Sequence, residues 1–194
     1  GTWDVEEYSW LDGQVGVVWN SYQRAVFGTS AATVSVSGIV ESRAGMRFEE
    51  SGYVVEGDTI DLAASAAAYN SINVVPGATA TINAGLSGTT GFTKLGTGTL
   101  TLGGVNTVSG TAMIAAGTLV AASDTALTAA SVVIPTGGRL EVPAGVTLNA
   151  VGVRLSGGSL AVPSLVVSQA SASPAVVLNS FEAVENLYDP TSSI

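Results

Sequence analysis

The chain has 194 residues, and only 11% of them are charged, against about 25% in typical soluble proteins. Fifteen acidic residues against six basic ones give a net charge of −9, which disfavours nucleic acid and anionic membranes as partners. The absence of cysteine and histidine excludes disulfides, cysteine-based zinc sites and Cys-His or Ser-His-Asp catalysis.

Residues 1–32 contain all three tryptophans, Trp3, Trp10 and Trp19. We interpret this segment as an aromatic-rich N-terminal cap, because the end of a repetitive fold needs atypical sequence to cover it. The same tryptophans are candidate ligand contacts, since indole rings offer flat faces on which sugar rings can stack. The segment also lacks the basic and apolar regions of a signal peptide, so we expect a fragment of a mature protein.

Short alternating runs follow, such as ATVSVSGIV at 32–40, GTGTLTL at 96–102 and GGRLEV at 137–142. Such runs, bounded by Gly, Pro, Asn and Ser, predict many short strands. The alanine-rich stretch 62–72 is the nearest approach to a helical pattern. No apolar run reaches the ~20 residues of a membrane span, so we expect no direct membrane insertion.

A period of 19 to 21 residues relates glycines along the chain: Gly57, Gly77, Gly98, Gly117, Gly138 and Gly158. Leucines recur two positions after the last four: Leu100, Leu119, Leu140 and Leu160. Apolar residues precede the same four: Leu95, Ile114, Ile134 and Leu155. A repeat of this length that carries two or three strands indicates one rung, that is, one complete circuit, of a parallel β-helix.

The predicted fold is therefore all-β: a single-stranded parallel β-helix, or β-solenoid, with about 20 residues per rung. A β-sandwich or jelly roll is the alternative, but it usually lacks such a strict period. We expect the helix to span residues 33–180. An acidic tail, or a linker to a following module, occupies 181–194.

Two acidic residues, Glu41 and Asp61, lie one period apart, with Arg43 and Arg47 nearby. A patch of this kind is either a solvated face that blocks edge pairing, a weak Ca²⁺ site or part of a polysaccharide-degrading site. We count Glu41 and Asp61 among the candidate ligand contacts, and we expect no catalytic residue, cofactor or metal ligand. The segment GFTKLGTGTLTLGG at 91–104 resembles a phosphate loop only superficially, because Thr101 replaces the last glycine of G-x-G-x-x-G and no helix follows.

Residues 91–123 resemble the autotransporter-associated β-strand repeat, close to L-x-K-x-G-x-G-T-L-x-L-x-G-x-N-T-Y-x-G-x-T-x-I-x-x-G-T-L. The matching positions are Lys94, Gly96, Gly98, Thr99, Leu100, Leu102, Gly104, Asn106, Thr107, Gly110, Ile114, Gly117, Thr118 and Leu119. The departures are Phe92, Val108 and Ala112. The segment before the repeat is also similar to sequences that precede it in the family, on the basis of Trp3, Asp4, Trp10, Trp19, Phe27 and Gly28.

This resemblance implies a right-handed parallel β-helix in a passenger fragment of a bacterial surface or secreted protein, located outside the cell or at its surface. It also implies adhesive roles, with host or matrix glycans or other cells as expected partners, and it does not imply a catalytic activity. Lys94 is typical of the family, but the sequence supplies no partner for it. The leading hypothesis is a non-enzymatic stalk or adhesive module. The alternatives are a polysaccharide-degrading enzyme on the same fold and a glycan-binding module without catalysis.

Overall fold

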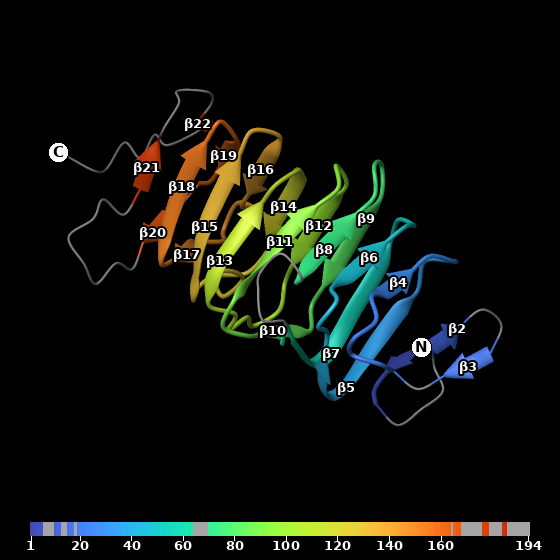
Figure 1. The fold of residues 1–194 in the computed structure, drawn as a ribbon. Helices are drawn as coiled ribbons and strands as arrows, with labels where there is room; N and C mark the ends of the chain where they lie inside the picture. The colour runs from blue at the N-terminus through green and yellow to red at the C-terminus, as the bar shows by residue number, and fades with distance from the viewer. Residues whose placement is uncertain are drawn as a thin grey trace.

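The computed structural model describes residues 1–5, 10–12, 15–17, 19–63, 70–163, 165–167, 176–178 and 184–185. Throughout these residues the regular elements are strands, which wind into a rod from β1 (Thr2–Trp3) at one end to β21 (Val176–Leu178) and β22 (Val184–Glu185) at the other (Figure 1). The predicted all-β parallel β-helix is confirmed, with about six rungs of about 21 residues each. No helix that could cross a membrane occurs in the described part of the chain.

Two long parallel sheets form the main faces of the rod. The ten-stranded sheet contains, besides β1 and β22, β5 (Thr33–Glu41), β7 (Tyr53–Asp61), β9 (Thr79–Ile82), β10 (Gly85–Ser87), β12 (Thr99–Leu102), β14 (Gly117–Ala121), β16 (Gly138–Glu141) and β19 (Ser159–Ala161). The eight-stranded sheet contains, besides β21, β4 (Ala25–Phe27), β6 (Met46–Phe48), β8 (Ser71–Val74), β11 (Gly91–Leu95), β13 (Gly110–Ile114), β15 (Ala130–Pro135) and β18 (Gly152–Ser156). From β4 on, the chain alternates between the two sheets, except that β9 and β10 both join the ten-stranded sheet and that β17 (Leu148–Ala150) and β20 (Leu165–Val167) lie outside both sheets.

Two smaller pairings complete the strands. β17 pairs in parallel with β20. β2 (Trp10–Asp12) pairs with β3 (Val15–Val17) in an antiparallel hairpin near the N-terminal end. Of the alanine-rich stretch 62–72, the last two residues begin β8, whereas 64–69 lie outside the described residues.

The predicted leucine column is present in the ten-stranded sheet. Leu100 aligns with Leu119, Leu119 with Leu140 and Leu140 with Leu160, and all four are buried. The strand alternation sends every second side chain inward, so these leucines stack along the axis of the rod. The glycine series is only partly correct, because Gly57 lies within β7 opposite Val36 and Gly98 falls opposite Ala78, not Gly77.

In the eight-stranded sheet, one residue predicted for the inward column, Leu95, is wrong. Lys94, rather than Leu95, aligns with Ile114 and with Ile72, and its side chain is fully buried. The apolar period led to Leu95 because a lysine is rarely found in a core. The inward column of this sheet therefore contains one charged residue among aliphatic ones.

A glycine forms the corner at which a rung passes from the eight-stranded to the ten-stranded sheet. Gly96 has a φ of 73°, which L side chains rarely adopt. A Cβ atom at this position would collide with the carbonyl oxygen of Val74 in the preceding rung. The glycine thus allows two successive corners to lie in direct contact.

Aromatic rings fill the core at the N-terminal end. Phe27 and Phe48 stack with their centroids 4.5 Å apart and an interplanar angle of 7°, while Trp3 meets Trp19 edge-on at 5.1 Å. Tyr53 packs against both phenylalanines. Strands β1 and β4, which lie within the segment predicted as a cap, pair with β5 and β6 respectively. Of the predicted tail 181–194, the structure describes only β22.

Candidate functional site

Glu41 and Asp61 are brought together by the pairing of β5 with β7. They are register partners, and Asp61 is in turn aligned with Ser87 of β10. The residues before them, Val40 and Ile60, are buried, so the alternation directs both carboxylates outward. Neighbouring parallel strands are ~4.8 Å apart, and the two acids therefore form adjacent positions of one exposed column.

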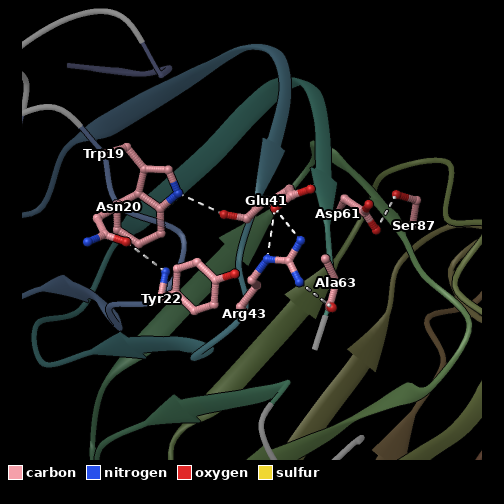
Figure 2. A network of polar contacts seen from close by, with 8 residues as sticks. All are labelled: Trp19, Asn20, Tyr22, Glu41, Arg43, Asp61, Ala63 and Ser87. Carbon is pink, nitrogen blue, oxygen red and sulfur yellow. Dashed lines mark hydrogen bonds and ion pairs between the residues drawn. The ribbon is translucent and has the colours of Figure 1, made fainter. Parts of the chain in front are cut away.

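An arginine two residues after Glu41 organises this surface (Figure 2). Arg43 donates from Nε to Glu41 Oε2 at 2.9 Å and forms an ion pair from Nη2 to the same oxygen at 2.8 Å. Its Nη1 donates to the carbonyl oxygen of Ala63 at 3.4 Å. The guanidinium carbon lies 5.4 Å from the centre of the Tyr22 ring, within the range of a cation–π contact.

Tyr22 is the exposed aromatic residue of this surface, with 76% of its area accessible. Its backbone N–H donates to Asn20 Oδ1 at 3.0 Å, an Asx-type turn that fixes the local chain. Asp61 Oδ1 accepts from the hydroxyl of Ser87 at 3.2 Å. We refer to Asn20, Tyr22, Glu41, Arg43, Asp61 and Ser87 as the Tyr22 surface.

The tryptophans predicted as ligand contacts lie differently. Trp3 is fully buried and Trp19 is 8% exposed, and Trp19 Nε1 donates to the carbonyl oxygen of Glu41 at 2.7 Å. Trp10 begins β2, but its side chain lies outside the described residues. Sequence reasoning missed Tyr22. The signal that could have found it is its spacing of 21 residues, one rung, from Arg43.

A cavity of about 270 Å³ shares Glu41 and Trp19 with this region and is also lined by Val5, Ser21 and Ile39. Among the described residues that line it, Glu41 is the only acid, and Asp61 is not part of the lining. Groups of three or more acidic residues placed to hold a metal ion are absent from the described part of the chain. The region thus combines a small hollow of mixed lining with a polar, aromatic surface.

Two further ion pairs repeat the spacing of Glu41 and Arg43. Arg47 pairs with Glu49 at 2.7 Å, and Arg139 pairs with Glu141 at 3.6 Å. Both are half-exposed pairs on one strand or at its end. Over the residues that the structure describes, only Arg43 of these three arginines lies over an aromatic ring, so the Tyr22 surface differs from the other two pairs.

Lys94 occupies the core rather than the surface. Its Nζ donates to the carbonyl oxygens of Gly96 at 2.7 Å, Leu95 at 3.0 Å and Ala116 at 3.1 Å. The first two belong to its own corner and the third to the corner of the next rung. Burial lowers the pKa of Lys94 from 10.5 to about 8, so the amine remains mostly protonated at neutral pH and its three donors meet three acceptors.

The parallel β-helix and the repeat within it define the class of protein to which the chain is similar. Residues 92–121 match the family model described as passenger-associated-transport-repeat, which confirms the resemblance noted from residues 91–123. The chain is thus a parallel β-solenoid that carries a passenger repeat, the kind of module expected outside the cell or at its surface.

The chain is also similar in sequence to one curated protein. The chain is 36% identical over 121 residues to the adhesin BmaC autotransporter of Brucella suis biovar 1 (strain 1330). The match covers 59% of this chain but only 3% of that protein. No solved structure matches the chain.

Proposed function

We propose that the chain is a non-enzymatic module of an extracellular or cell-surface adhesin, which serves as a rigid stalk and as an adhesive surface. The observation that carries the proposal is the parallel ladder that runs through successive rungs of both sheets over a buried aliphatic column. Such a solenoid is held by contacts between neighbouring rungs and keeps its outer side chains in fixed rows. The similarity to an adhesin autotransporter supports the adhesive role.

The arrangement of the acids favours this function over polysaccharide hydrolysis. Glycosidases place two carboxyl groups on either side of the scissile bond, about 5–10 Å apart. Here Glu41 and Asp61 are side by side on adjacent strands, Glu41 is engaged by Arg43, and Glu41 is the one acid among the described residues that line the adjoining cavity. Arg47 is paired with Glu49 instead of with either of them.

Adhesion can be measured with the chain displayed on a bacterium that does not otherwise adhere. We expect such cells to bind host cells or matrix-coated wells more strongly than cells that display an unrelated solenoid. Equal binding by the two strains would contradict the adhesive role.

The enzymatic alternative is tested separately by incubation of the purified chain with a panel of polysaccharides. Release of sugars that disappears in Glu41→Gln or Asp61→Asn would overturn the non-enzymatic assignment.

A further inference from the structure

The Tyr22 surface presents an aromatic ring that is exposed and yet held in place. Exposed aromatic side chains normally sample several rotamers, and binding must then immobilise them at a cost in conformational entropy. Here the chain at Tyr22 is fixed through Asn20, and the ring lies against Arg43. Arg43 is itself held by Glu41 and by the carbonyl of Ala63. The ring is thus pre-organised for a flat partner.

Acceptors for hydroxyl groups lie in the same surface. Glu41 uses Oε2 for Arg43, and Asp61 uses Oδ1 for Ser87. Over the described residues, Glu41 Oε1 and Asp61 Oδ2 have no protein partner. A hydroxyl that donates to a carboxylate forms a stronger hydrogen bond than one that donates to a neutral oxygen. Both free oxygens belong to neighbouring positions of one column, as expected for adjacent hydroxyls of one ligand.

The charge of the surface limits the class of ligand. The surface contains two carboxylates and one guanidinium, which is already paired with Glu41, and the whole chain carries a net charge of −9. A ligand with its own carboxylate, sulfate or phosphate groups would be repelled. A pyranose ring without charged groups meets each requirement, because its C–H face stacks on an aromatic ring and its hydroxyls donate to carboxylates.

We infer that the Tyr22 surface binds a neutral oligosaccharide, with one sugar ring stacked on the face of Tyr22 that Arg43 leaves open and hydroxyls of a neighbouring sugar unit bound by Glu41 and Asp61. The inference rests on the proposed adhesive function and names the class of ligand for one part of that surface. The cavity beside Glu41, lined by both polar and apolar residues, gives room for an adjoining substituent such as the N-acetyl group of an N-acetylated sugar.

The test is calorimetric titration of the purified chain with three sets of probes: neutral oligosaccharides of glucose, galactose, mannose and N-acetylglucosamine; sialylated and uronic-acid oligosaccharides; and a lysine-rich peptide. We expect binding to one or more of the neutral sugars and none to the acidic ones. Tyr22→Ala should weaken this binding at least tenfold, whereas Tyr22→Phe should retain it. Asp61→Asn should weaken it several-fold, and its effect is clean because Asp61 does not contact Arg43.

The matched control is Arg139→Ala, since Arg139 and Glu141 form an ion pair of the same spacing without an aromatic ring. This variant should bind as the wild type does, and circular dichroism should show that every variant is folded. Neutral sugars that fail to bind, binding undiminished in Tyr22→Ala, or preferential binding of acidic sugars or of the peptide would each overturn the inference. If the displayed chain adheres to cells while no neutral sugar binds, the adhesive function stands and the saccharide site is wrong. If sugars bind but the displayed chain does not adhere, the saccharide site stands and the adhesive function is wrong.

Discussion

At the scale of single residues, Lys94 is the most unusual side chain of the described core. A lysine buried among aliphatic residues costs free energy unless its donors are satisfied. Here three carbonyl oxygens from two successive corners accept its three N–H groups. The residue therefore joins neighbouring rungs at a point where the backbone turns and its carbonyls leave the regular ladder.

Replacement of Lys94 by methionine tests this role. Methionine fills a similar volume but leaves the carbonyls of Leu95, Gly96 and Ala116 without their donor, and unsatisfied buried groups cost about 1–3 kcal/mol. We expect Lys94→Met to lower the free energy of unfolding in urea by about that amount at pH 7. Arg139→Met, on the surface, is the control and should change it little. A Lys94→Met variant as stable as the wild type would mean that the cost of burying the charge equals the benefit of its hydrogen bonds.

The pH dependence of stability gives a second test of Lys94. Because burial lowers its pKa to about 8 in the folded state, between about pH 8 and 10.5 the unfolded chain keeps a proton that the folded chain has lost. Raising the pH through this window therefore favours the folded state. Relative to Lys94→Met, the wild type should gain about 2 kcal/mol between pH 7 and 9.5. Urea unfolding of both proteins measures the difference, and parallel curves would contradict the prediction.

The leucine positions follow from sequence alone, whereas the role of Lys94 does not. The column from Leu100 to Leu160 could be predicted because burial of apolar groups enforces a strict period. Lys94 interrupts the same kind of column, and hydropathy gives no sign that a lysine can be satisfied by carbonyls of a corner two residues away. The family resemblance marked the position, but only the fold supplies its partners.

At the scale of elements, the corners set how closely successive rungs approach. Gly96 and Gly77 both have positive φ, 73° and 78°, but a Cβ at Gly96 would collide with Val74, whereas at Gly77 it would meet nothing. Both substitutions to alanine incur backbone strain of about 1–3 kcal/mol. We expect Gly96→Ala to lower the free energy of unfolding by about 2 kcal/mol more than Gly77→Ala, as measured in urea. Equal losses would show that corner contact contributes nothing beyond the backbone strain.

The strands also explain which part of the candidate site could be foreseen. Glu41 and Asp61 could be placed together from their spacing, because both sit on regular strands of one sheet. Tyr22 lies before β4, outside regular strands, so the in-out alternation of strand side chains says nothing about it, and its spacing of 21 residues from Arg43 is the one signal in the sequence. The tryptophans drew attention by their chemistry, yet Trp3 and Trp19 are buried, since large apolar rings cover the end of the core.

At the scale of the whole molecule, the rungs are interchangeable in register. Thr118 is aligned with Arg139, so deletion of residues 118–138 joins Gly117 to Arg139 and removes one circuit. We expect this variant to fold with a β-type circular dichroism spectrum and to unfold cooperatively. Its urea m value should be lower by about a sixth, since one of about six rungs is lost and m scales with the area exposed on unfolding.

A ten-residue deletion, 118–127, is the control for the whole-rung deletion. It shifts the following strands by half a circuit, so their apolar side chains no longer match the core. This variant should aggregate or remain unfolded in size-exclusion chromatography. If both deletions behave alike, the rungs do not act as the repeating units of stability.

The direction of the backbone ladder has a mechanical consequence. The strands run across the rod, and their hydrogen bonds run along it, so a rung adds only ~4.8 Å to the length of the rod. The same rung contains about 21 residues, which extend to roughly 70 Å when pulled straight. Tension on the two ends, applied in an optical trap, should therefore lengthen the molecule in repeated steps of roughly 65 Å. A single long extension would contradict this. Because the rungs unfold one at a time, a particle tethered to the rod can move away by many times the length of a rung while the remaining rungs stay folded.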